Sequence, residues 1–348
     1  MKVLMKGNEA IGEAAIRSGC TLYFGYPITP QNEIPEYMSR RLPTIPGGAY
    51  IQAETEVAAI NMVYGAVSTG RRAFTSSSSP GISLMMEGMS YLAGAELPCL
   101  VVNLMRGGPG LGNINPEQGD YFQATKGGGH GSYRVIVLAP SSVQEMADLT
   151  VLGLDLADKY RNPVMMLADG NLGQMMEPVE LQESYPNAHD KSGWALTGRK
   201  GRKGHLITSI YLDADEMEEY LKKLWTKYGE IQRTEARVNE YQADDAEVFI
   251  VAYGIVSRVA RAVVESLREQ GVKAGLIRPI TLWPFPVEAV RRRTEQARFF
   301  MSVEMSMGQM VEDVVLAVNG RRPVHFYGRS GGNVPTPAEV VAEVRKYL

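Results

Sequence analysis

Short apolar segments and helical segments alternate along the first half of the chain, and this alternation restricts the fold more than any other feature. Strand-like runs lie at residues 21–25, 72–76, 99–104, 135–139 and 164–168. Helical segments are predicted at residues 8–18, 34–41, 56–69, 82–95 and 143–160. Such an alternation is typical of a doubly wound, mostly parallel sheet. The sequence therefore predicts an α/β fold, with Asn8 as the N-cap of its first helix.

The same pattern divides the chain into three parts. Residues 1–186 are predicted to form the doubly wound domain, and residues 244–348 carry a second alternation of strands and helices. Residues 187–243 are interpreted as a linker with a charged helical excursion. Within it, residues 198–204 read Gly-Arg-Lys-Gly-Arg-Lys-Gly. A solvated loop is the simplest interpretation of this run, and an anion-binding site is the alternative.

Composition disfavours several classes of partner. The formal net charge of −3 gives no reason to expect nucleic acid. No run approaches the length of a membrane span, and residues 1–7 lack the apolar core of a signal peptide, so we expect a cytoplasmic protein with no membrane partner. Cys20 and Cys99 are interpreted as isolated, buried thiols. Two cysteines are fewer than the four thiolates that an iron–sulfur cluster requires.

Two polar motifs follow the first predicted strand. Tyr26-Pro-Ile-Thr-Pro30 is a non-helical turn because of its prolines, so Thr29 is presented at the carboxyl end of a strand, where parallel α/β sheets bind ligands. The alternative is that the Thr29 hydroxyl only satisfies its own turn. Glu56 begins a helical segment among apolar residues, a setting that suits proton transfer. Alternatively, Glu56 is an ordinary acidic residue in a first helical turn.

Other polar residues at predicted strand ends have no decisive signature. Arg106 is either a substrate contact or a surface arginine. The serines at positions 76–79 have no neighbouring base that would make one of them a nucleophile. Asp169, before Gly170, is interpreted as part of a loop and not as a magnesium ligand. The four histidines lack metal-ligand spacing, so no metal site is predicted.

Longer motifs resemble the alpha subunit of the 2-oxoacid:ferredoxin oxidoreductases. They occur in the order expected for that family and span most of the chain, at residues 26–30, 53–61, 75–81, 278–286, 303–310 and 328–337. Among subfamilies, the segments at residues 107–113 and 118–130 most resemble the branched-chain type, the ferredoxin-dependent 3-methyl-2-oxobutanoate dehydrogenase. The 2-oxoglutarate type is its close neighbour.

The resemblance implies a pyrimidine-binding domain of the thiamine diphosphate enzymes, followed by a transketolase C-terminal-like domain. It assigns to Glu56 the carboxyl group that binds the aminopyrimidine ring and shifts its tautomer, with Glu54 as the competing candidate. Glu56 is preferred because the Val-Ala-Ala after it matches the family's segment. Pro27 and Ser78 are further expected at the cofactor, with the other serines at positions 76–79 as alternatives to Ser78.

The same resemblance assigns substrate contacts and partners. Thr29 and Arg106 are expected beside the substrate, Arg106 because a guanidinium matches a carboxylate. The Gly-Asp-Gly…Asn signature of the metal-binding half is not found in the sequence, so thiamine diphosphate is expected to be shared with a beta subunit that holds Mg²⁺ and the diphosphate. Small gamma and ferredoxin-like delta subunits are further expected partners in a hetero-oligomer, with ferredoxin and coenzyme A. Iron–sulfur clusters are expected only on partner subunits.

The expected reaction is the oxidative decarboxylation of 3-methyl-2-oxobutanoate with coenzyme A to an acyl-CoA and CO2, with electrons passed to ferredoxin. Residues 107–113 carry no positive charge, which favours a branched apolar substrate over 2-oxoglutarate, whose second carboxylate needs a cation. Lys126 is a cation that could reach the pocket, so a 2-oxoglutarate enzyme is the alternative. A non-catalytic structural subunit is disfavoured because Thr29, Glu56 and Arg106 are all present.

Overall fold

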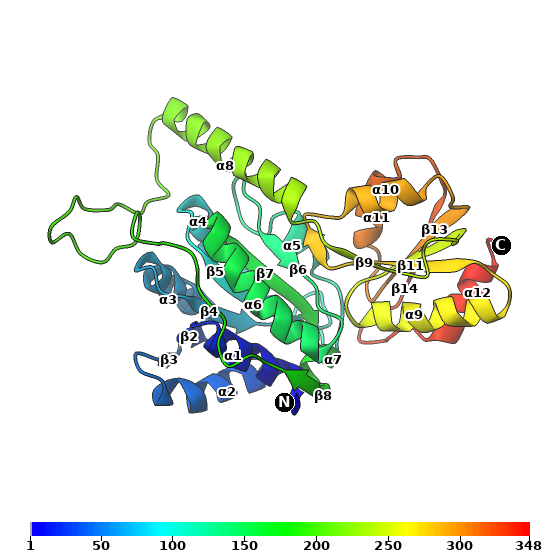
Figure 1. The fold of residues 1–348 in the computed structure, drawn as a ribbon, viewed down its shortest axis with the longest axis horizontal. Helices are drawn as coiled ribbons and strands as arrows, with labels where there is room; N and C mark the ends of the chain where they lie inside the picture. The colour runs from blue at the N-terminus through cyan, green and yellow to red at the C-terminus, as the bar shows by residue number, and fades with distance from the viewer. Residues whose placement is uncertain (1) are drawn as a thin grey trace.

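Three β-sheets organise residues 2–348, the part of the chain that the computed structural model describes (Figure 1). The largest has seven strands in the order β12-β6-β7-β5-β4-β2-β3, all parallel except β12, which pairs antiparallel with β6. Their bounds are β2 (Leu22–Gly25), β3 (Ala49–Gln52), β4 (Ala73–Ser77), β5 (Cys99–Met105), β6 (Ile136–Leu138), β7 (Pro163–Asp169) and β12 (Thr281–Trp283). The predicted doubly wound α/β fold is confirmed.

Two smaller sheets complete the framework. A five-stranded sheet in the order β14-β13-β10-β11-β9 is parallel except for its edge strand β9. Its strands are β9 (Val238–Tyr241), β10 (Val248–Val251), β11 (Ala274–Pro279), β13 (Phe299–Glu304) and β14 (Val324–Gly328). The third sheet is an antiparallel pair of β1 (Lys2–Lys6) and β8 (Met176–Glu180).

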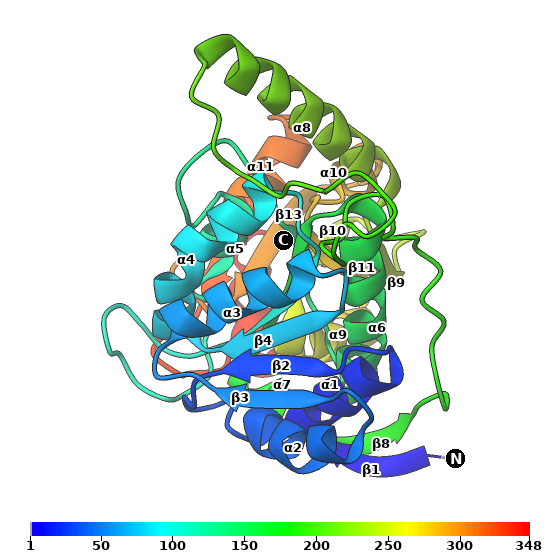
Figure 2. The same ribbon diagram turned by 90° about the vertical axis from the view of Figure 1, so that its left-hand side faces the viewer.

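Helices cover both faces of the seven-stranded sheet (Figure 2). α3 (Glu56–Ser68) packs against α4 (Ser79–Gly94), whereas α1 (Gly7–Arg17) packs against α2 (Glu33–Arg41) and α6 (Val143–Tyr160). Every residue of β5 and β7 is buried, because helices cover these strands on both sides. Burial on both faces explains why such strands read as continuous apolar runs.

The remaining helices belong to connections and to the second α/β unit. α9 and α12 lie on one face of the five-stranded sheet, and α10 and α11 lie on the other (Figure 1). The bounds are η1 (Leu42–Thr44), α5 (Tyr121–Thr125), α7 (Gly170–Gln174), α8 (Ala214–Thr234), α9 (Gly254–Glu269), α10 (Val287–Arg293), α11 (Met310–Val318) and α12 (Pro337–Arg345). Within residues 2–348, none of the helices combines the length and apolar character that crossing a membrane requires.

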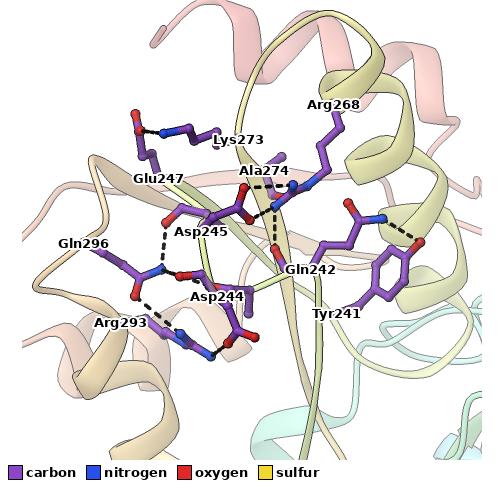
Figure 3. A network of polar contacts seen from close by, with 12 residues as sticks. Tyr241, Gln242, Asp244, Asp245, Glu247, Arg268, Lys273, Ala274, Arg293 and Gln296 are labelled. Atoms are coloured by element: carbon purple, nitrogen blue, oxygen red, sulfur yellow. Dashed lines mark hydrogen bonds and ion pairs between the residues drawn. The ribbon is translucent and has the colours of Figure 1, made fainter.

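A polar network closes the turn between β9 and β10 (Figure 3). The Arg268 guanidinium pairs with the Asp245 carboxylate at 2.6 Å and donates to the Gln242 carbonyl at 2.7 Å. The Gln296 amide donates to the carbonyl of Asp244 at 3.3 Å. These bonds fix the turn against α9 and against the segment after α10, and so hold the antiparallel edge strand in place.

Side chains join the two α/β units directly. The Gln118 side chain donates to the Tyr253 carbonyl at 3.0 Å and accepts from the Met305 backbone N–H at 3.0 Å. The Arg278 guanidinium binds both oxygens of the Glu145 carboxylate, each at 2.7 Å. A bidentate pair of this kind fixes orientation as well as distance. Together with β12, these contacts hold the second unit against the first sheet.

The prediction that Asn8 caps the first helix is wrong. β1 runs directly into α1, and Asn8 lies inside the first turn. Its side-chain amide donates to the Pro30 carbonyl at 3.0 Å and to Glu33 at 2.8 Å. The helix begins at Gly7 with Lys6 as its N-cap residue, and the Asn8 side chain binds partners outside the helix. The two cysteines are free and buried as predicted, and burial raises the pKa of Cys20 to about 12.

Candidate active site

The carboxyl ends of the parallel strands bring the predicted site residues to one edge of the seven-stranded sheet. β3 lies on one side of β2 and β4 lies on the other, so the strand order reverses between β2 and β4. Such a switch point leaves a crevice at the carboxyl ends, where ligands bind. Thr29 follows β2, Glu56 follows β3, Ser78 follows β4 and Arg106 follows β5.

Glu56 is the first residue of α3 and is 5% exposed, whereas Glu54 is exposed. The cap of α3 is the Thr55 hydroxyl, which accepts the backbone N–H of Ala58 at 3.1 Å. The Glu56 carboxylate is therefore free of the capping role. Its Oε1 atom accepts a long hydrogen bond from the Ser77 hydroxyl, at 3.5 Å.

Gly81, in the first turn of α4, leaves room for the side chains of Glu56 and Ser77. A Cβ atom at this position would lie 2.1 Å from Ser77 Oγ and 2.4 Å from Glu56 Oε1. Neither distance is compatible with a real side chain. Glycine at this position therefore lets the Ser77 hydroxyl and the buried Glu56 carboxylate pack directly against the start of α4.

The other serines of the run have different partners. Ser76 donates to Gln31 Oε1 at 2.5 Å, and Ser79 donates to Asp120 Oδ2 at 2.6 Å. The Ser78 hydroxyl is buried and finds no hydrogen-bond partner within residues 2–348. Leaving a buried hydroxyl unpaired costs about 1–3 kcal/mol. Ser78 is therefore the serine of this run whose hydroxyl remains available to a ligand.

Thr29 and Arg106 lie in contact. Arg106 Nη1 donates to the Thr29 carbonyl at 3.1 Å, and Nη2 donates to the Leu111 carbonyl at 3.4 Å. The Nε atom of Arg106 is buried and has no partner within residues 2–348. The Thr29 hydroxyl accepts from the Asn32 side chain at 3.4 Å, so it also serves its own turn. Pro27, in the same turn, is exposed.

Asp120 belongs to the same edge, although sequence reasoning assigned it no role. Its Oδ2 atom accepts from Asn103 at 2.8 Å as well as from Ser79. Ser79 Oγ in turn accepts the backbone N–H of Arg106 at 3.0 Å. Burial raises the pKa of Asp120 above its usual range. This carboxyl group therefore fixes the backbone that carries Arg106. The one feature of the sequence that could have pointed to Asp120 was its place in the motif at residues 118–130.

The glycine loop after Arg106 is held by backbone contacts. Gly112 has φ +53°, and a Cβ there would lie 1.8 Å from the Gly107 carbonyl oxygen, so only glycine fits. The Glu117 carboxylate accepts the backbone N–H of Gly108 at 3.0 Å and that of Gly331 at 3.2 Å. Glu117 thereby joins this loop to the second α/β unit.

Two open clefts lie beside these residues. One, of about 570 Å³, is lined by Thr29, Asn32 and Asn171 among others. The second, of about 450 Å³, lies between Ser79 and Met307, on different units. Within residues 2–348, neither cleft is lined by a lysine or an arginine.

Lys126 and Asp169, which the sequence analysis also considered, do not line these two clefts and have other partners. Lys126 pairs with Asp313 and lines a separate cleft with Trp225 and Trp283. Asp169 ends β7 and caps α7 by accepting two backbone N–H groups. Residues 2–348 contain no cluster of three side chains suited to holding a metal ion.

The arrangement of the two α/β units is also found in a solved structure of another protein. A split-gene transketolase structure shares this fold, with a TM-score of 0.62 over 99% of this chain and 98% of that chain, at 13% identity. Residues 13–218 match the family "Pyruvate flavodoxin/ferredoxin oxidoreductase, thiamine diP-bdg", and residues 246–340 match "Pyruvate:ferredoxin oxidoreductase core domain II".

Comparison with individual relatives narrows the family to which the chain is assigned. The chain is 53% identical to the ketoisovalerate oxidoreductase subunit VorB of Methanothermobacter thermautotrophicus, over 99% of this chain and 97% of the relative. It is 36% identical to the 2-oxoglutarate synthase subunit KorA of Methanocaldococcus jannaschii, over 98% of both. The structure of the 2-oxoglutarate:ferredoxin oxidoreductase from Magnetococcus marinus superposes with a TM-score of 0.90 at 30% identity, over 99% of this chain and 65% of that chain. The chain belongs to the 2-oxoacid:ferredoxin oxidoreductase family.

Proposed function

We propose that this chain supplies the aminopyrimidine-facing half of a thiamine diphosphate site in an enzyme that oxidatively decarboxylates 3-methyl-2-oxobutanoate. Coenzyme A takes the acyl group, and ferredoxin takes the electrons. The observation that carries the proposal is the buried Glu56 carboxylate, which packs against Gly81 at the start of α4. Family membership supplies the class of reaction.

The residues at this edge fit the cofactor. Thiamine diphosphate, when bound, supplies the electron sink for decarboxylation. Glu56 holds a proton for the ring nitrogen of the aminopyrimidine, and Ser78 offers a hydroxyl that has no partner within residues 2–348. Pro27 presents an exposed ring surface on the neighbouring turn.

The surroundings of Glu56 suit proton transfer better than those of Glu54. Burial separates the Glu56 carboxylate from bulk water, so its proton is exchanged with a bound partner and not with solvent. The Ser77 hydroxyl, at 3.5 Å, is a weak donor that leaves the carboxylate oxygens able to bind a ligand. Glu54 is exposed and lacks this isolation.

Arg106 is proposed to bind the carboxylate of the 2-oxoacid. Its two hydrogen bonds to carbonyl groups hold the guanidinium in place without neutralising it. The Asp120–Ser79 pair fixes the backbone at the same point. A charge held in this way is ready to accept a carboxylate, because little reorganisation is needed on binding.

Three observations favour 3-methyl-2-oxobutanoate over 2-oxoglutarate. Identity to the ketoisovalerate oxidoreductase subunit, named after the same compound, exceeds that to the 2-oxoglutarate synthase subunits. The two clefts carry no lysine or arginine from residues 2–348 that would pair with a second carboxylate. Lys126, the cation that favoured the alternative, is paired with Asp313. An isopropyl group needs only apolar surface, whereas a buried unpaired carboxylate is costly.

A partner is needed to complete the site. Large apolar side chains are exposed around this edge: Tyr26, Val57, Leu84, Leu111 and Met307. Exposed apolar surface beside a binding site is typical of a protein interface. We assign this face to a beta subunit that carries Mg²⁺ and the diphosphate site. Iron–sulfur clusters belong to partner subunits in the same proposal. The boundaries after residues 186 and 243, and a cytoplasmic location, remain predictions.

Reconstitution with the partner subunits tests the proposal. Catalytic efficiency with 3-methyl-2-oxobutanoate should exceed that with 2-oxoglutarate by roughly tenfold or more, which is about 1.4 kcal/mol in transition-state binding. A complex that prefers 2-oxoglutarate would overturn the substrate while leaving the role of Glu56 to be tested separately. A complex that oxidises neither acid would overturn the function itself.

A further inference from the structure

The loop that follows Arg106 is fixed by its own hydrogen bonds. Arg106 and Pro116 form an antiparallel bridge, which joins the two ends of the loop. Between these ends, the backbone N–H of Gly107 donates to the Asn115 carbonyl at 2.9 Å, and that of Asn113 donates to the Gly107 carbonyl at 3.0 Å. Residues 107–115, here called the glycine loop, are therefore held by contacts within the chain.

The second α/β unit also holds the glycine loop. The side-chain amide of Asn113 donates to the Gly331 carbonyl at 3.2 Å, and its oxygen accepts the backbone N–H of Asn115 at 2.9 Å. Gly332 packs so closely that a Cβ atom there would lie 2.3 Å from Asn115 Cβ. A loop that is held on both sides presents its side chains at fixed positions, as the wall of a selective pocket requires.

The glycine loop carries two large aliphatic side chains. Leu111 is 83% exposed and Ile114 is 61% exposed. Ile114 lines the cleft of about 570 Å³ that Thr29 also lines, whereas Leu111 does not belong to its wall. Thr29 is the residue whose carbonyl accepts a hydrogen bond from the Arg106 guanidinium. An acyl chain that extends past Thr29 from a carboxylate bound at Arg106 therefore reaches the cleft that Ile114 lines.

The wall of this cleft suits an uncharged, branched chain. Its other apolar residues are Pro30, Pro116 and Met175. Within residues 2–348, the one charged side chain in the wall is that of Glu33, whose carboxylate pairs with Lys6 at 3.1 Å. A second substrate carboxylate would meet this negative charge and no cation from the wall, which is unfavourable. A branched aliphatic group would instead bury apolar surface against Ile114.

We propose that Ile114 selects the acyl chain of the 2-oxoacid. This inference rests on the proposed function, because it takes Arg106 as the contact for the substrate carboxylate. The Ile114 side chain packs against the isopropyl group of 3-methyl-2-oxobutanoate, whereas the methyl group of pyruvate is too short to make the same contact. A guanidinium at position 114 would pair with the far carboxylate of 2-oxoglutarate through two parallel hydrogen bonds. The residue at this position therefore sets both the size and the charge of the acyl chain that is accepted.

Substitutions of Ile114 in the reconstituted complex test this role, with kcat/KM measured for the three acids. Ile114→Ala should lower kcat/KM for 3-methyl-2-oxobutanoate by roughly tenfold or more and change that for pyruvate much less. Ile114→Val keeps a branched side chain and should stay close to the wild type. Ile114→Arg should raise kcat/KM for 2-oxoglutarate relative to 3-methyl-2-oxobutanoate by roughly tenfold or more. The matched control Val315→Ala shortens an exposed aliphatic side chain of α11 that lines neither cleft, and it should leave all three values unchanged.

The ratios of kcat/KM separate a role in specificity from a structural role, because a damaged fold lowers all three values alike. The Ile114 side chain is largely exposed, so the circular dichroism spectrum and complex assembly should be unchanged in each variant. Variants that keep the wild-type ratios, or that lose all three activities together, overturn the inference and leave the proposed function standing. A wild-type complex that oxidises none of the three acids overturns both.

Discussion

Replacing Asp169 by asparagine should remove the contribution of this buried carboxyl group to the pH dependence of the unfolding free energy. Asp169 ends β7 and is fully buried. Its Oδ1 atom accepts the backbone N–H groups of Asn171 and Leu172, and Oδ2 accepts that of Ile255 in the second unit at 3.3 Å. Burial outweighs these hydrogen bonds and raises the pKa of Asp169 from 3.8 to about 6.

The sign follows from comparing the folded and unfolded states. The folded chain holds the Asp169 proton more tightly than the unfolded chain does, so this group stabilises the fold fully below pH 3.8. That stabilisation is lost as the pH rises through about 6. The complete effect is about 3 kcal/mol, of which about 1.4 kcal/mol falls between pH 5 and pH 8.

Urea unfolding of the wild type and of Asp169→Asn at pH 5 and pH 8 measures the effect. The difference in unfolding free energy between the two proteins should change by about 1.4 kcal/mol between these pH values, with the wild type gaining at pH 5. Unfolding transitions that coincide when followed by circular dichroism and by fluorescence justify the two-state analysis from which these free energies are obtained. Asp215→Asn removes an exposed carboxylate and serves as the control. An equal difference at both pH values would refute the reasoning.

Four further results are expected. Glu56→Gln should lower turnover of the reconstituted enzyme by roughly a hundred- to ten-thousand-fold with assembly intact, whereas Glu54→Gln should cost much less; the reverse ranking would move the assignment to Glu54. Arg106→Leu should weaken substrate binding by roughly 1.5–3 kcal/mol, seen in KM, with cofactor binding unchanged. Gly81→Ala should displace the Glu56 carboxylate and lower turnover roughly a hundredfold. Turnover per active site, with the active sites titrated and compared with the amount of folded protein, would check this. The isolated chain should not bind thiamine diphosphate tightly, and calorimetry showing Mg²⁺-dependent tight binding would contradict this.

The local sequence pattern was sufficient to predict the strands and helices that position the candidate site. The strand at residues 21–25 and its two-proline turn, together with the helix that begins at Glu56, follow from sequence periodicity and chain stiffness alone. These elements bring Thr29 and Glu56 to the same edge in any parallel sheet. Periodicity could not show that β12 joins the first sheet, because three residues carry no pattern and the pairing joins segments about 140 residues apart.

The roles that sequence reasoning missed depend on partners distant along the chain. Asp120 binds Ser79, 41 residues away, and Lys126 binds Asp313, 187 residues away. Neither pair has a local signature, since both residues lie in a loop rich in glycine. Asn8 failed as a predicted cap for the same reason, because its partner Pro30 is 22 residues away. In each case a hydrogen bond to a residue distant along the chain determines the role of the side chain.

Unpaired polar atoms give an independent reason to place ligand binding at the carboxyl edge of the first sheet. Buried side-chain atoms of Asn32, Thr75, Ser78, Asn103 and Arg106 have no hydrogen-bond partner within residues 2–348. These residues follow or belong to β2, β4 and β5, the strands around the switch point. Each unpaired atom costs about 1–3 kcal/mol. Five other unpaired buried atoms within residues 2–348, on Asn8, Arg72, Gln123, Asn162 and Tyr228, belong to other parts of the chain. A ligand that supplies the missing partners recovers this energy on binding, so the unpaired atoms at this edge suit it to hold a cofactor and its substrate.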